Sequence, residues 1–253
     1  MFLGLWMVVW NCTSHAQGQG IKVPAGGSAD YAVLEYRERE FTFRAEIGAV
    51  QIERIKSDPG FIALSLPGFV PSGGDPGQPA MPLKSFLFEA DARRDLTIRI
   101  THLDSAVIDL SRHGFNEKIL PVIPSARKDA FPKTFRADPE AYSGNDWTGP
   151  PVFSVEYGGA MRGMTVSTLH FCPLRYHPAT HRIKVYYNVR AVIGPPGGSR
   201  SRPVPSPDFN PVFDRVVRRQ DEPVKKAVTA EEPMTMVIVS DTVVPKMLEP
   251  IVR

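Results

Sequence analysis

Apolar and polar residues alternate over much of this chain, with the period of two that is typical of β-strands buried on one face. The alternation is clear where Phe41, Phe43, Ala45 and Ile47 are separated by polar side chains. It recurs at 96–103 and at 164–171. Strands are expected at 31–36, 41–47, 61–64, 85–90, 96–103, 106–110, 152–157, 164–174 and 182–193. Short strands separated by turn residues predict a mainly β protein, an antiparallel β-sandwich.

Proline and glycine support this prediction. The chain has 20 glycines and 25 prolines, and neither residue is tolerated well inside a helix. Residues 176–181 predict a tight hairpin turn between the last two strands. Residues 120–151 contain six prolines and several basic residues, which indicates an extended surface connection. Connections of this length are usually functional or disordered.

The N-terminus is typical of an export signal. Residues 1–10 form a continuous apolar run, which is too short to span a bilayer. Small residues follow at Ser14 and Ala16, so residues 1–16 are expected to be a signal peptide cleaved after Ala16. No basic residue precedes the run, and a buried first strand is the alternative; lipidation at Cys12 is disfavoured by the preceding Trp10 and Asn11. The mature protein is therefore expected to be secreted or at the cell surface, with no membrane contact beyond the signal.

Two segments with different composition follow the expected sandwich. The Gly- and Pro-rich residues 194–199 end the sandwich, which is expected to cover 17–198. Residues 199–233 form a basic linker that contains several prolines. Residues 234–240 then read as a short buried strand and 243–253 as the first turns of a helix. Residues 234–253 are therefore expected to be the start of a truncated α/β domain.

The chemistry-bearing residues predict no catalytic group, cofactor or metal site. The net charge is +3 and there are two cysteines, so neither nucleic-acid binding nor a cysteine-based zinc site is indicated. His177 and His181 flank Pro178 in a turn and do not share a helix face. Cys172 lies at the end of a strand and is expected to be a small core residue. The carboxylates at 104, 109 and 117 have no partner that the sequence identifies, and no glycine-rich phosphate loop is present.

The basic residues of the long connection are more informative. Arg127, Lys128 and Lys133 lie between its prolines. An extended, exposed segment that presents one cation is suited to a trypsin-like pocket. Ordinary solvated charge is the alternative interpretation.

Several motifs, in a consistent order, resemble the propeptide of the gingipain family. Residues 162–186 carry the most specific match: an Arg-Gly pair at 162–163, a Pro-Leu-x-Tyr-x-Pro turn at 173–178 and a closing strand with Lys-Val-Tyr at 184–186. Residues 77–82 match a family turn with Met81 in place of leucine, and 122–128 and 141–147 match further segments. The final residues resemble the first strand and helix of the family's catalytic domain, which is caspase-like. The resemblance covers roughly residues 30–253.

The resemblance implies a propeptide that acts as intramolecular chaperone and latency inhibitor of a secreted cysteine endopeptidase. The partner would be the cognate catalytic domain in cis. The chain stops before the His and Cys of the family's catalytic dyad, so it is expected to be inactive alone. In the family a basic residue of the propeptide blocks the specificity pocket; Arg127 is favoured here, with Lys128 and Lys133 as alternatives.

The same resemblance implies an activation cleavage in the linker. Lys225 and Lys226 lie where the family's processing site falls, and Arg218 and Arg219 are the alternative. A basic linker is a sensible substrate for an enzyme that cuts after Arg or Lys.

Two other functions compete with the propeptide interpretation. The first is a secreted adhesion or carbohydrate-binding module, which would use Tyr142 and Trp147 as an exposed aromatic platform. The second is a structural cell-surface domain without a ligand.

Overall fold

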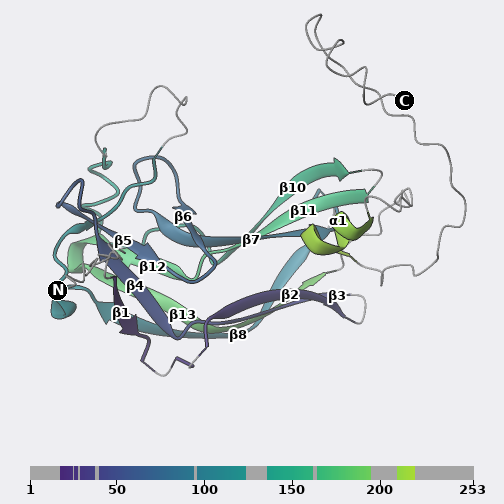
Figure 1. Ribbon diagram of the computed structural model, residues 1–253, viewed down its shortest axis with the longest axis horizontal. Coiled ribbons are helices and arrows are strands. Elements are labelled where there is room, and N and C mark those ends of the chain that lie inside the picture. The colour runs from purple at the N-terminus through teal and green to yellow at the C-terminus, as the bar shows by residue number, and fades with distance from the viewer. Residues whose placement is uncertain are drawn as a thin grey trace, which may run out of the picture. The chain divides into compact units, whose positions relative to one another are not determined.

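The computed structural model describes residues 18–24, 26–27, 29–37, 40–93, 96–123, 136–161, 164–194 and 210–219, and strands make up most of them (Figure 1). Residues 1–16, the expected signal peptide, and residues 234–253, the expected start of an α/β domain, lie outside these ranges. The strands are β1 (Gln19–Lys22), β2 (Tyr31–Arg37), β3 (Glu40–Glu46), β4 (Ala49–Arg54), β5 (Phe61–Ser65), β6 (Val70–Gly73), β7 (Met81–Glu89), β8 (Thr97–Asp109), β9 (Lys118–Ile119), β10 (Phe153–Met161), β11 (Met164–Phe171), β12 (Leu174–His177), β13 (Arg182–Gly194) and β14 (Val217–Arg218). The helices are the 3-10 turns Ser111–His113 and Pro178–Thr180, and α1 (Asn210–Val216).

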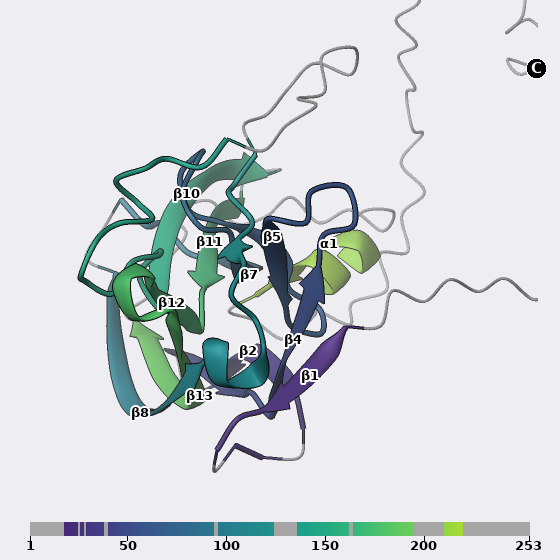
Figure 2. The ribbon, with the colours of Figure 1, turned by 90° about the vertical axis from the view of Figure 1, so that its left-hand side faces the viewer.

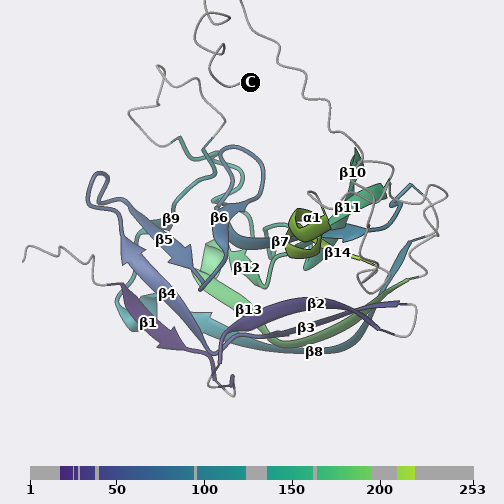
Figure 3. The same ribbon diagram turned by 45° about the vertical axis from the view of Figure 1, so that its right-hand side comes forward.

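The strands of the described ranges form three sheets. One has the order β10-β11-β7-β14, with β6 also paired to β7; another has the order β12-β13-β3-β2, with β8 also paired to β13. These two sheets face one another as two layers (Figures 1 and 3). The third sheet, β1-β4-β5-β9, lies at one end of the layers (Figure 2). Most pairs are antiparallel, while β5 with β9 and β7 with β14 are parallel. The predicted antiparallel sandwich is confirmed.

Strand β13 links the two largest core clusters. Its inward residues Ile183 and Val185 are buried against the end sheet, in a cluster that also holds Ile52 and Leu64. Further along the same strand, Val189, Ala191 and Ile193 are buried between the two layers. Alternate residues of a strand share one face, so one long alternating strand serves both clusters.

Aromatic rings fill the space between the layers. Phe43 of β3 lies with its ring centroid 4.7 Å from that of Phe171 and 5.0 Å from that of Phe153. Phe41 contacts Phe88 edge to face at 5.1 Å. Tilted and edge-to-face pairs add about 0.5–1.5 kcal/mol each to the burial of the rings. The apolar residues whose alternation predicted strand 41–47 therefore lie on the inner face of the sandwich.

Two predicted elements differ from the structure. The segments 96–103 and 106–110 form one continuous strand, β8, because irregular register against β13 lets the strand bend without a turn. The expected strand 164–174 divides at Cys172 and Pro173. There the chain leaves the layer of β11 and enters the layer of β12, and proline cannot donate a ladder hydrogen bond.

Part of the expected linker packs onto the sandwich. Residues 210–219 form α1 and β14, and Phe213 and Val217 are buried with Met164 and Val166 of β11. Strand β14 pairs with the outer edge of β7. None of the helices in the described ranges is long and apolar enough to cross a membrane.

Candidate functional site

Residues 124–135 of the predicted connection 120–151 carry Arg127, Lys128 and Lys133, lie outside the described residues, and are named the basic connection. The segment that precedes them is paired to the turn between β6 and β7. Strand β9 adds to β5, and the chain then runs along residues 77–80. The backbone hydrogen bonds run from Gly77 N to Val122 O (2.9 Å), from Ala80 N to Leu120 O (2.8 Å) and from Val122 N to Gln78 O (2.7 Å). Backbone hydrogen bonds therefore hold the chain as far as Val122.

The segment that follows the connection returns to the same turn. The N–H of Asp138 donates to the carbonyl oxygen of Gly77 at 3.0 Å. Gly77 therefore binds both flanks, one through its N–H and one through its C=O. Its φ of +88° lies in the region that favours glycine, and a Cβ there would lie 3.4 Å from the Cβ of Asp138. The Gly-x-Pro turn identified in the sequence is the point where the two ends of the connection meet.

Residues 139–151 are then fixed along the sandwich. Thr148 and Tyr176 exchange two backbone hydrogen bonds, of 2.7 and 3.0 Å. The indole of Trp147 lies under the ammonium of Lys184, 4.4 Å from the ring centroid. The hydroxyl of Tyr142 donates to Ile119 O at 2.6 Å, and burial of this side chain raises its pKa.

These contacts weaken the aromatic-platform interpretation. Tyr142 packs against the core cluster of the end sheet instead of facing solvent. Trp147 contacts His177 edge to face at 5.2 Å. Both rings join the return segment to the sandwich.

A cavity of about 450 Å³ opens beside the turn that holds the connection. Gly74, Asp75 and Gln78 form one side of it, and Glu156 and His170 line another. The Nδ1 of His170 is hydrogen-bonded to the Ser85 hydroxyl at 2.8 Å, and its Nε2 lies 3.5 Å from a Glu156 oxygen. The three side chains form a polar row across β7, β11 and β10, on the face of the sheet that does not enter the core. Sequence alternation placed His170 in a strand but could not identify its partners.

The predicted site residues divide into two groups. Arg127, Lys128 and Lys133 lie outside the described residues, and so do Lys225 and Lys226. Arg218 lies in β14. Arg219 directly follows β14; its side chain is 14% exposed, and its guanidinium lies 3.0 Å from Asp214.

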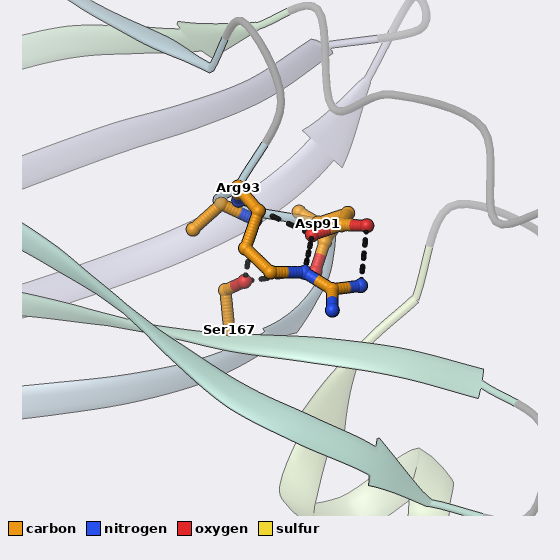
Figure 4. A network of polar contacts seen from close by, with 5 residues as sticks. Asp91, Arg93 and Ser167 are labelled. Carbon is orange, nitrogen blue, oxygen red and sulfur yellow. Dashed lines mark hydrogen bonds and ion pairs between the residues drawn. The ribbon is translucent and has the colours of Figure 1, made fainter.

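Sequence reasoning missed a buried polar network at the end of β7 (Figure 4). Ser167 is fully buried; its hydroxyl donates to Ala90 O at 2.8 Å and accepts from Ala92 N at 3.0 Å. The Arg93 guanidinium binds both oxygens of Asp91, at 2.8 and 2.9 Å. This network fixes the turn that leaves β7. The sequence signal was a serine on the strand face that also carries the apolar Leu169 and Phe171.

The carboxylates that lacked predicted partners are paired. Asp104 binds His102 at 2.9 Å, and Asp109 binds Arg182 at 3.3 Å. Glu117 binds Arg54 across 63 residues of sequence. Within the part of the chain that the structure describes, no cluster of three or more His, Cys, Asp and Glu is placed to hold a metal ion. Cys172 is buried, and desolvation raises the pKa of its thiol to about 11, as befits a core residue and not a nucleophile.

This sandwich, with its two layers and end sheet, is similar in fold to chains solved in studies of zymogens. Specifically, it matches the fold of gingipain prodomains. A chain from a structure on the zymogenic latency of gingipain K from Porphyromonas gingivalis superimposes with a TM-score of 0.62 at 23% identity, covering 70% of this chain and 98% of that chain. A chain from the complex of the pro- and mature domains of RgpB from the same organism superimposes with a TM-score of 0.58 at 13% identity, covering 75% and 98%.

The sequence comparison gives the same relationship. The chain is homologous to Lys-gingipain of Porphyromonas gingivalis, with 24% identity over 186 residues. Lys-gingipain HG66 and Lys-gingipain W83 match equally, at 24% identity. The match covers 72% of this chain and 11% of each relative, so the chain spans a small part of their length. No family model matches the chain.

Proposed function

We propose that this chain is the propeptide of a secreted, gingipain-like cysteine endopeptidase. It assists the folding of its catalytic domain and keeps that domain latent until the linker is cut. The observation that carries the proposal is the prodomain fold, together with the Lys-gingipain homology over 186 residues. The RgpB structure that this chain resembles is a complex of pro- and mature domains. That complex supports a catalytic domain in cis as the partner of this chain.

The basic connection is proposed to supply the inhibitory contact. Both of its ends are bound by Gly77, so the twelve residues 124–135 between them start and finish at one point of the rigid sandwich. A rigid base lowers the entropy lost when a loop binds, which favours tight binding. Arg127 is proposed to enter the specificity pocket of the enzyme, with Lys128 and Lys133 as alternatives.

The activation cleavage is proposed to fall at Lys225 and Lys226. The alternative cleavage pair, Arg218 and Arg219, is less accessible to a peptidase. Arg218 belongs to a strand paired with β7, and the Arg219 guanidinium is held by Asp214. A peptidase binds its substrate as an extended segment with free backbone groups, so cleavage at 218–219 would require residues 210–219 to detach first.

The remaining parts of the chain fit the same proposal. Residues 1–16 are proposed to direct export, which places the precursor outside the cytoplasm. Residues 234–253 are proposed to be the first strand and helix of the catalytic domain.

The test is an inhibition assay with the catalytic domain of a gingipain-type peptidase. The full chain and the variants Arg127→Ala, Lys128→Ala and Lys133→Ala are added, and residual activity is measured on Arg and Lys peptide substrates. Lys56→Ala is the matched control, because it removes an exposed cation from another turn. We expect inhibition by the wild type and by the control, and a large loss with Arg127→Ala.

The other outcomes are equally informative. Loss of inhibition only with Lys128→Ala or Lys133→Ala would keep the role and move the blocking residue. Equal inhibition by all variants would reject the basic connection as the blocking element. No inhibition by the wild type would reject the propeptide role and favour a binding module.

A further inference from the structure

Three basic side chains form one row on the outer face of the β8–β13–β3 sheet, where these strands run side by side (Figure 3). Arg190 of β13 lies directly opposite Arg44 of β3 on one side and His102 of β8 on the other. Directly opposite residues in an antiparallel pair have Cβ atoms about 4.5–5.5 Å apart, and like charges at this distance destabilise the sheet. Arg44 and Arg190 are both cationic, so their repulsion favours an anion that bridges them.

The two arginines differ in their protein partners. The Arg44 guanidinium lies 3.2 Å from Glu35, and the same carboxylate oxygen lies 2.9 Å from Arg37. Arg190 is exposed, and its guanidinium has no hydrogen-bond or ion-pair partner among the residues that the structure describes; only its backbone carbonyl oxygen accepts, from the Thr101 hydroxyl at 3.2 Å. Its guanidinium, which has five N–H donors, is free to bind a ligand together with the remaining donors of Arg44.

Negatively charged side chains lie beside this row, at the next residues of the strands that point to the same face. Glu46 follows Arg44 by two residues, and Asn188 lies opposite Glu46. Asp104 accepts hydrogen bonds from His102 at 2.9 Å and from Asn188 at 3.1 Å. The bond from His102 lowers the pKa of Asp104, which keeps this carboxylate ionised. The face therefore carries a positive row beside a negative row.

A cavity of about 430 Å³ spans both rows. Its lining includes Arg44, Arg190, Glu46 and Asp104, and Gly27 closes one side. A Cβ added at Gly27 would lie 1.2 Å from the carboxylate oxygen Oε1 of Glu46. Because Gly27 has no side chain, the Glu46 carboxylate can lie against it in the lining of the cavity. The volume lies within the range of small-ligand sites, about 300–1,000 Å³.

We propose that this cavity binds a dipeptide as a zwitterion. The ligand's carboxylate bridges Arg190 and Arg44, and its ammonium group lies against Glu46 and Asp104. Same-face residues two apart in a strand are separated by about 6.8 Å. An extended chain of two residues spans about 7 Å, so the two termini match the two charged rows. This site shares no residue with the proposed inhibitory contact and does not depend on the propeptide role.

The test uses glycylglycine as the probe, titrated into the full chain while backbone amide shifts are followed by NMR. N-acetylglycine, which lacks the ammonium, and glycinamide, which lacks the carboxylate, are titrated in parallel at matched ionic strength. Arg190→Gln removes the free guanidinium, and Lys56→Gln is the control of equal charge change. Gly27→Ala displaces the Glu46 carboxylate and tests the negative row separately.

We expect saturable shifts at residues 44, 188 and 190 with glycylglycine. Affinity should fall about tenfold or more in Arg190→Gln, for loss of charge-assisted hydrogen bonds, and should be unchanged in Lys56→Gln. N-acetylglycine and glycinamide should each bind the wild type more weakly than glycylglycine does. The Gly27→Ala variant should no longer bind glycylglycine more tightly than N-acetylglycine. Absence of saturable shifts, equal binding by Arg190→Gln, or equal affinity for N-acetylglycine and glycylglycine in the wild type would overturn the proposal. Thermal unfolding of each variant verifies that it is folded, and Arg190 is exposed enough that its replacement should not unfold the chain.

Discussion

Gly77→Ala is predicted to weaken inhibition without unfolding the sandwich. Gly77 has φ +88°, and its N–H and C=O bind the two flanks of the basic connection. A side chain in the left-handed region costs about 1–2 kcal/mol. The added Cβ would meet Asp138 at 3.4 Å, an ordinary contact distance, so steric overlap adds little. The backbone can escape this strain only by moving φ, which disturbs the hydrogen bonds to Val122 and Asp138.

Gly114→Ala is the matched control. Gly114 has φ +80° with no atom within 4 Å of an added Cβ, and it ends the 3-10 turn after β8. Both variants should lose about 1–2 kcal/mol in free energy of unfolding, measured with urea. Only Gly77→Ala should raise the inhibition constant against the catalytic domain. The increase should be about 5- to 30-fold if the backbone strain at residue 77 is relieved by moving the hydrogen-bonded segments at Val122 and Asp138.

Two results would refute this reasoning. If Gly77→Ala inhibits as well as the wild type, the geometry of the two flanks does not control the inhibitory contact. If both variants weaken inhibition to the same extent, the effect comes from overall stability and not from the turn.

Three further predictions concern the sandwich itself. Ser167→Ala should lower the free energy of unfolding by about 2–4 kcal/mol, because it removes the partner of the buried Ala90 carbonyl oxygen and of the part-buried Ala92 N–H; replacement of the exposed Ser85 by alanine should cost less than about 1 kcal/mol, and equal losses would contradict the prediction. Phe213→Ala should release residues 210–219 and speed trypsin cleavage at 218–219 about tenfold or more, since local opening controls proteolysis; unchanged cleavage would show that this segment is not held by that ring. Burial raises the pKa of Cys172 to about 11 from 9.0, so the folded state holds this proton more tightly and stability should fall as pH rises from 9 to 11. Cys172→Ala should reduce that slope in urea titrations, and an unchanged slope would contradict the assignment.

Local patterns were enough to predict much of the fold. The alternation at Phe41 and Phe43 predicted a strand with one buried face, and the hairpin at 176–181 has the predicted place between β12 and β13. Cys172 was predicted to be a core residue and is buried. These features depend on neighbours within a few residues, so the sequence carries them directly. The basic residues of the connection and the lysine pair of the linker stay predictions.

Other features depend on pairing between distant segments. Strand β14 meets β7 about 130 residues away, and Arg54 meets Glu117 across 63 residues. The sequence also suggested a turn near residue 104 that the irregular pairing of β8 with β13 makes unnecessary. No local pattern specifies which strand lies beside another or in which register.

The amino-acid sequence by itself predicted that the fold is a β-sandwich, indicated one buried face for strands such as 41–47, and showed motifs that resemble a gingipain propeptide. Burial on one face imposes a period of two, and that period is visible in one dimension. Only the tertiary structure decided that both flanks of the basic connection meet at Gly77, and that Arg44, Arg190 and His102 form one row. These arrangements follow from the packing of whole sheet faces, which selects strand partners and register across the entire chain.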